Sequence, residues 1–212
     1  MARVKLLELL DRKWEDGTRP KDLFAALVSK DPASYLGDII AGLEGDKAKV
    51  RNGCAELASL LSEREPKLLY PKLALFQSNL GAKEPVLRWE AVCTIGNLVV
   101  ADTKGATRAS LEPITRHLHD KSIVLQGHAV RALTKMARVF PELAPGIFKS
   151  LVAAADRFSG TRVGYVVEAM AAFTSEDKLR KAAERFVAPY ADSELKPVAT
   201  KARKALKALR AR

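Results

Sequence analysis

The segment VRNGCAELASLL, which begins at Val50, decides the fold because four later segments repeat its pattern. The others are LRWEAVCTIGNL from Leu87, LQGHAVRALTKM from Leu125, VGYVVEAMAAF from Val163 and VATKARKALKAL from Val198. Successive starts are 37, 38, 38 and 35 residues apart. A nearly fixed period of this size is typical of proteins that stack one structural unit many times.

Each segment has the apolar spacing of a single α-helix. In the second one, Leu87, Ala91, Ile95 and Leu98 recur at intervals of three and four residues, which places them on one helical face. A second apolar helical stretch precedes each segment, so the sequence predicts that every repeat is a pair of helices. The five quoted segments are the second helices of these pairs.

Prolines are expected to mark the helix boundaries. Asp31 followed by Pro32 is typical of an N-cap with proline at the first helical position. Three further prolines lie near expected helix starts, and three fall inside first helices, where they are expected to cause kinks. The first group is Pro66, Pro141 and Pro197, and the second is Pro71, Pro113 and Pro189.

The second helices resemble those of HEAT repeats. In that family the second helix follows an aspartate-rich turn and opens with Val-Arg, and here Asp46 precedes Val50 and Arg51. Leu87 with Arg88 matches the same positions. The resemblance covers about residues 34 to 210, and it implies that the second helices line a concave face.

The fold that we expect is all-α: a right-handed α-solenoid of about five HEAT-like helix pairs with an N-terminal capping pair. A lone helix pair cannot bury its apolar stripe, so pairs stack against their neighbours. Residues 1–212 are predicted to form a single repeat domain. Its parts are capping helices at 1–33 and repeats at 34–72, 73–113, 114–146, 147–186 and 187–212.

The composition is that of a soluble, helical protein. Hydrophobic residues make up 48% of the chain and charged residues 29%, whereas aromatic residues make up only 6%, which favours helices over strands. Because no secretory signal and no run of about 18 apolar residues is found, we expect a cytoplasmic protein without membrane insertion. Cys54 and Cys93 fall in apolar helical patterns and are expected to be reduced packing residues.

The charge is concentrated in the second half of the chain. Residues 1–113 contain 17 basic and 16 acidic residues, whereas residues 114–212 contain 19 basic and 9 acidic ones. A basic surface attracts phosphate backbones, an anionic membrane or acidic proteins, although a basic terminal helix is also a common solubilising cap. The candidate residues for nucleic-acid or anion binding are Lys201, Arg203, Lys204 and Lys207.

The leading hypothesis is a non-enzymatic scaffold that binds a protein partner on its concave face. Solenoids expose long surfaces suited to this role. The candidate partner-binding residues are Arg51, Arg88, Trp89, Arg131, Lys135 and Arg138. The alternative is binding of a nucleic-acid backbone through the basic C-terminal half, and no cofactor or small-molecule substrate is evident.

Catalytic and metal sites are not indicated by the residues. His117 and His119 are two positions apart on a helix and diverge, and no phosphate-binding glycine loop is present. The architecture is similar to that of HEAT-like alkylpurine DNA glycosylases, and Arg88 with Trp89 matches part of their DNA-binding surface. Residues 91–100 nevertheless lack the catalytic aspartate, and Glu90 is expected to point away from Trp89.

Overall fold

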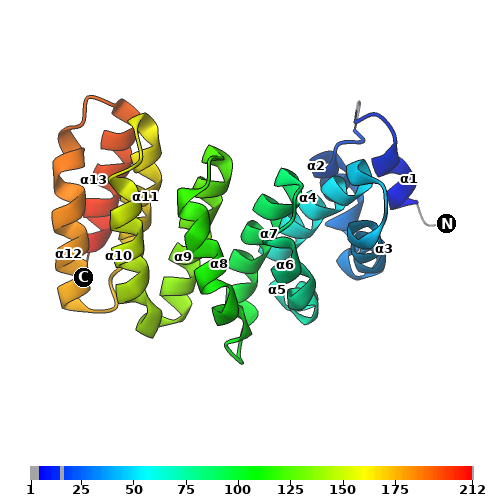
Figure 1. Ribbon diagram of the computed structural model, residues 1–212, viewed down its shortest axis with the longest axis horizontal. Coiled ribbons are helices and arrows are strands. Elements are labelled where there is room, and N and C mark those ends of the chain that lie inside the picture. Colours follow the sequence, from blue (N-terminus) through cyan, green and yellow to red (C-terminus); the bar gives the residue numbers. More distant parts are fainter. Residues whose placement is uncertain (1–4, 15–16, 212) are drawn as a thin grey trace. The chain divides into compact units, whose positions relative to one another are not determined.

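The computed structural model describes residues 5–14 and 17–211, and every regular element in that part of the chain is helical. The chain forms two compact units, Met1–Thr107 and Arg108–Arg212. We call them the N-terminal unit and the C-terminal unit and describe each by itself (Figure 1). The prediction of a single domain stays a prediction.

The N-terminal unit begins with short helices and continues with two helix pairs. Its elements are α1 (Leu6–Asp11), α2 (Pro20–Leu23) with a π-helical continuation (Phe24–Val28), α3 (Pro32–Glu44), α4 (Ala48–Arg64), α5 (Pro66–Leu69), a 3-10 turn (Tyr70–Lys72), α6 (Leu73–Asn79), α7 (Pro85–Leu98) and a 3-10 turn (Val99–Ala101). The second helices α4 and α7 pack against each other, and their first helices α3 and α6 pack on them. Leu57, Leu61, Ile95 and Leu98 are fully buried between these elements.

The C-terminal unit contains three helix pairs. After a 3-10 turn across the unit boundary (Ala106–Ser110), its elements are α8 (Leu111–Arg116), a 3-10 turn (His117–His119), α9 (Ile123–Val139), a 3-10 turn (Pro141–Leu143), α10 (Ala144–Ala155), a 3-10 turn (Gly160–Arg162), α11 (Val163–Ala169), a 3-10 turn (Met170–Ala172), α12 (Asp177–Val187), a 3-10 turn (Ala188–Asp192) and α13 (Lys196–Arg210). The second helices α9 and α11 pack together, as do α11 and α13. Leu133, Val166 and Leu209 are fully buried in this core.

The sequence predicts the second helices correctly, because Val50, Leu87, Leu125, Val163 and Val198 all lie within the first three residues of α4, α7, α9, α11 and α13. All five side chains are buried. The repeat boundaries at 72/73, 113/114, 146/147 and 186/187, however, lie inside first helices or directly beside their 3-10 turns. The predicted repeat boundaries therefore stay predictions.

Prolines lie in several of the 3-10 turns of the first helices. Pro71 lies in the 3-10 turn between α5 and α6, and Pro189 lies in the 3-10 turn that ends α12. Pro113 is in the first turn of α8, where the missing N–H costs little, and the kink predicted at this position stays a prediction. The cap at Asp31 is confirmed, since its carboxylate accepts a hydrogen bond from the Ser34 N–H at 3.4 Å.

Candidate partner-binding groove

A groove of about 200 Å³ opens between the second helices α9 and α11 of the C-terminal unit. Three of the predicted partner-binding residues line it together, while the other three belong to the N-terminal unit. The full lining is Val130, Arg131, Thr134, Lys135, Arg138, Tyr165, Glu168 and Ala169.

Helical spacing brings the three basic residues to one edge of the groove. Arg131, Lys135 and Arg138 follow one another at intervals of four and three residues along α9, so their side chains share a face. Leu133 and Met136, on the opposite face, are completely buried in the core. The same amphipathic pattern that fixes α9 in the core therefore presents its cations to the groove.

Tyr165 forms the facing wall of the groove, and a glycine allows its approach. A Cβ atom on Gly127 would lie 3.3 Å from the Tyr165 ring, which is closer than most carbon contacts, so a larger residue would displace the ring. Two cations flank this ring. The Arg131 guanidinium lies 5.9 Å from its centroid and the Lys201 ammonium 5.0 Å from it, within the range of cation–π attraction.

The electrostatic balance in the groove is positive. Glu168 is the acidic residue in the lining, and its carboxylate pairs with the Lys201 ammonium of α13 at 2.8 Å. Arg131 and Arg138 are exposed, and neither has an ion-pair partner in the described part of the chain. Their charge is therefore available to a ligand.

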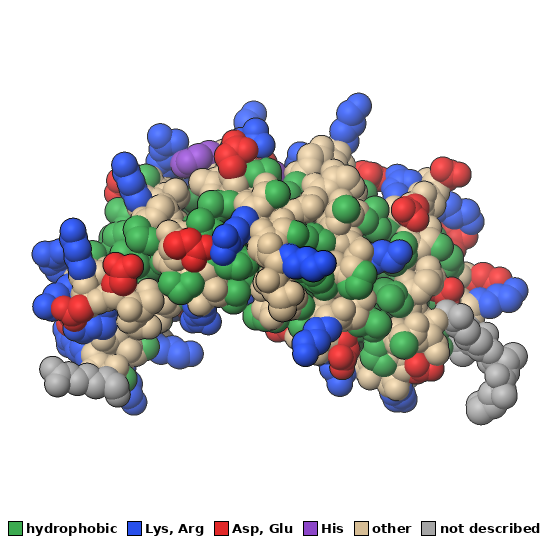
Figure 2. All heavy atoms as spheres, turned by 90° about the horizontal axis from the view of Figure 1, so that it is seen from below, with side chains coloured by type: hydrophobic (Ala, Val, Ile, Leu, Met, Phe, Trp, Pro, Cys, Tyr) green, Lys and Arg blue, Asp and Glu red, His purple; other side chains and the backbone are tan. Residues whose placement is uncertain are grey.

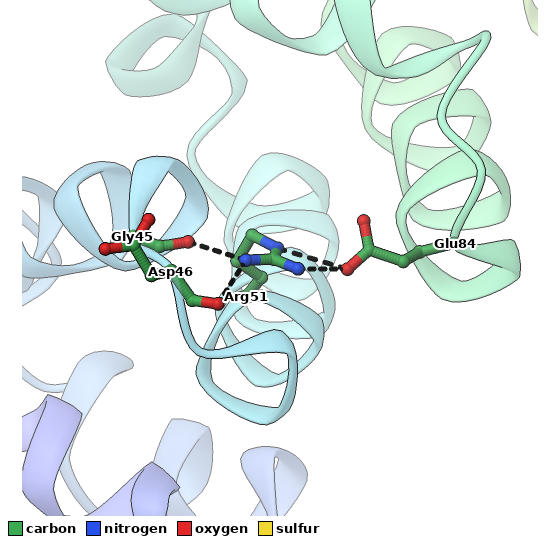
Figure 3. A network of polar contacts seen from close by, with 4 residues as sticks. All are labelled: Gly45, Asp46, Arg51 and Glu84. Carbon is green, nitrogen blue, oxygen red and sulfur yellow. Dashed lines mark hydrogen bonds and ion pairs between the residues drawn. The ribbon is translucent and has the colours of Figure 1, made fainter.

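Arg51 instead serves the packing of the N-terminal unit (Figure 3). Its Nη1 donates to the backbone oxygens of Gly45 and Asp46 at 2.8 and 2.7 Å, and its other nitrogens bind the Glu84 carboxylate at the start of α7. The side chain is 22% exposed. The guanidinium thus ties the α3–α4 turn to the next repeat, and its predicted role in partner binding stays untested.

Trp89 and Glu90 lie on α7 in an arrangement that differs from the expectation. The Trp89 indole N–H donates to the Glu90 carboxylate at 3.1 Å, so the prediction that Glu90 points away from the tryptophan is wrong. Consecutive helical residues do not usually face each other, but the long glutamate side chain bends back to the indole. Burial raises the pKa of Glu90 to about 7, against hydrogen bonds from Ser59 and Trp89 that lower it.

Arg88, the remaining predicted residue, is half-buried on the same helix. Its Nε is buried and has no hydrogen-bond partner in the structure. Cys93, one turn beyond Trp89, is half-buried, Cys54 is fully buried, and neither forms a disulfide among the described residues.

The basic residues of α13 divide into two groups. Arg203, Lys204 and Lys207 are exposed, whereas Lys201 is turned toward Glu168 and Tyr165. Figure 2 shows Lys and Arg side chains standing out around the C-terminal unit, at the left of the view. Residues 108–212 contain 20 basic and 10 acidic residues.

Within residues 5–14 and 17–211, no group of three or more His, Cys, Asp or Glu side chains is placed to hold a metal ion. In that same part of the chain, no helix has both the length and the apolar character needed to cross a membrane.

Tyr165 and Glu168 are the two polar residues that α11 contributes to the groove, and neither was expected from the sequence. Tyr165 stands two residues after Val163, the position that Trp89 takes after Leu87. An aromatic residue recurring at this outward position was the available signal. Glu168 has no counterpart in the other repeats that would single it out.

No protein-family model matches the sequence, and no curated protein does either. Solved structures match the fold over almost the whole chain. A designed armadillo repeat protein has 18% identity and a TM-score of 0.70, with 97% of this chain and 98% of that chain covered. An engineered protein from the Northeast Structural Genomics Consortium has 18% identity and a TM-score of 0.69, with 97% of both chains covered.

A second designed armadillo repeat protein, solved in complex with the peptide (KR)4, has 17% identity and a TM-score of 0.69. It covers 97% of this chain and 98% of its own. At 17 to 18% sequence identity, the likeness to these structures shows a shared fold alone. The chain is therefore an all-α helical repeat solenoid of the armadillo type, and a specific HEAT or glycosylase relationship stays a prediction.

Proposed function

We propose that the chain is a non-enzymatic scaffold that binds a protein partner along the second helices of its C-terminal unit. The observation that carries this proposal is the groove between α9 and α11, where Arg131, Lys135 and Arg138 lie beside an apolar floor. Such a mixture of apolar surface with a few oriented polar groups is typical of recognition sites. The peptide complex of the second designed protein supports the same use of this fold.

Photo-crosslinking tests this proposal. A photoreactive amino acid in place of Lys135 is expected to capture a protein partner in a lysate of the source cells, with or without nuclease. The same amino acid in place of Lys149, an exposed lysine on the first helix α10, is the matched control and is expected to capture much less of that partner. Equal capture at both positions, or none at either, would contradict the proposal.

The exposed cations of α13 support a second candidate, binding of a nucleic-acid backbone. Arg203, Lys204 and Lys207 add charge at a surface outside the groove. Phosphate contacts release counterions, so affinity for random duplex DNA is expected to fall steeply as salt rises. Absence of binding even at low salt eliminates this candidate and leaves the protein-binding proposal intact.

A further inference from the structure

We infer that the groove between α9 and α11 accepts an extended acidic segment of a partner protein, with an apolar side chain between two carboxylates. This inference rests on the proposed scaffold function and specifies the chemistry of its ligand. The carboxylates pair with Arg131 and Arg138, and the apolar side chain packs on Val130, Ala169 and Tyr165.

The positive charge of the groove favours a negatively charged ligand. Three cations line it, and its carboxylate, Glu168, is already paired with Lys201 from α13. Because Arg131 and Arg138 are exposed and have no ion pair within the described residues, a ligand carboxylate meets them without displacing an internal carboxylate. Arginine also binds carboxylates in a bidentate manner, which orients the ligand.

The length of the groove suits a short extended segment. Val130 and Arg138 are eight residues apart on α9, so the lining extends about 12 Å along the helix at a rise of about 1.5 Å per residue. An extended chain advances about 3.3 Å per residue, and about four residues therefore fit. Alternate side chains of such a segment are about 7 Å apart, and two of them reach Arg131 and Arg138 because both arginine side chains are long.

The floor of the groove favours a protein segment over a phosphate backbone. Val130 and Ala169 line the bottom of the groove, where both are almost completely buried, and the Tyr165 ring adds an aromatic wall. A nucleic-acid backbone has no apolar side chain to place there. An acidic segment with one aliphatic or aromatic residue uses both the cations and the floor.

The flanking cations hold the Tyr165 wall in place. Arg131 and Lys201 approach the ring at 5.9 and 5.0 Å, and the missing side chain of Gly127 lets the ring pack on α9. A ligand carboxylate that binds Arg131 leaves Lys201 to retain the ring. The site is therefore formed before the ligand arrives, which lowers the entropic cost of binding.

Peptide titration of the full chain tests this inference. A short labelled peptide centred on Glu-Leu-Glu is expected to bind, and the same peptide centred on Lys-Leu-Lys is not. Combining Arg131→Glu with Arg138→Glu is expected to weaken binding of the acidic peptide about tenfold or more, mainly by faster dissociation. Combining Lys149→Glu with Lys178→Glu changes the net charge equally at exposed sites on the first helices α10 and α12, and should change affinity much less.

Three results would overturn the inference: equal binding of the basic peptide, an equal loss in the control variant, or tighter binding of random duplex DNA through the same two arginines. If a protein partner still cross-links at position 135 while the acidic peptide does not bind, the inference fails and the scaffold proposal stands. If neither occurs, both fail.

Discussion

Glu90, a half-buried carboxyl on α7, allows both the sign and the size of a change in the free energy of unfolding to be predicted. Burial raises its pKa from 4.5 to about 7, so folding disfavours the ionised form. Below the pKa of Glu90 in the unfolded state, the carboxyl is protonated in both the folded and the unfolded state, and it does not lower the free energy of unfolding. As the pH rises from 4.5 toward 7, the unfolded state loses its proton first, and stability falls.

The full cost of Glu90 is present above pH 7. At about 1.4 kcal/mol per pKa unit, it amounts to about 3 kcal/mol at pH 8 and less than about 1 kcal/mol at pH 5. Glu90→Gln removes the charge and keeps an oxygen to accept the Trp89 indole N–H. The variant is therefore expected to be more stable than the parent at pH 8 and to differ little from it at pH 5.

Urea unfolding at both pH values, followed by the fluorescence of Trp14 and Trp89, measures this difference. Glu63→Gln is the matched control, because Glu63 is exposed on α4, and this change is expected to shift the free energy of unfolding by less than about 0.5 kcal/mol at either pH. If Glu90→Gln gave no extra stability at pH 8, or the same gain at both pH values, the burial argument would be refuted.

Three other changes test the packing and the groove. Arg51→Ala removes four polar contacts and is expected to lower the free energy of unfolding by about 2 kcal/mol. The control Lys181→Ala removes one partner of an exposed ion pair and should lower it by less than about 0.5 kcal/mol. Burial raises the pKa of Asp102, but hydrogen bonds from Thr107, Tyr70 and backbone N–H groups outweigh it and hold the pKa at about 2. Asp102→Ala should therefore lower the free energy of unfolding by about 3 kcal/mol near pH 7. The loss should become progressively smaller below pH 4, as thermal unfolding can measure. Gly127→Ala should change the free energy of unfolding by less than about 1 kcal/mol, because the gain in helix propensity offsets the crowding of the Tyr165 ring. The same substitution should weaken binding of the acidic peptide in titrations.

The second helices could be predicted from the sequence because each repeat must bury one stripe against its neighbours. Leu87, Ala91, Ile95 and Leu98 are all buried, and their spacing alone indicates the helix and its inward face. First helices were harder to delimit, since 3-10 turns such as Tyr70–Lys72 interrupt them and break the helical period.

The groove could be predicted only in part. Arg131, Lys135 and Arg138 share one helical face, and that follows from their spacing. Tyr165 and Glu168 join them only through the packing of α11 beside α9, which no local pattern specifies. In the same way, spacing on a helix does not reveal the bond between consecutive residues Trp89 and Glu90, because it depends on how the longer side chain bends.

Hydrogen–deuterium exchange of the full chain, with and without the partner captured at position 135, tests the central claim most directly. Binding along the second helices is expected to slow exchange in α9 and α11 while leaving α8 and α10 unchanged. Slower exchange confined to α8 and α10, or to the N-terminal unit, would contradict the account.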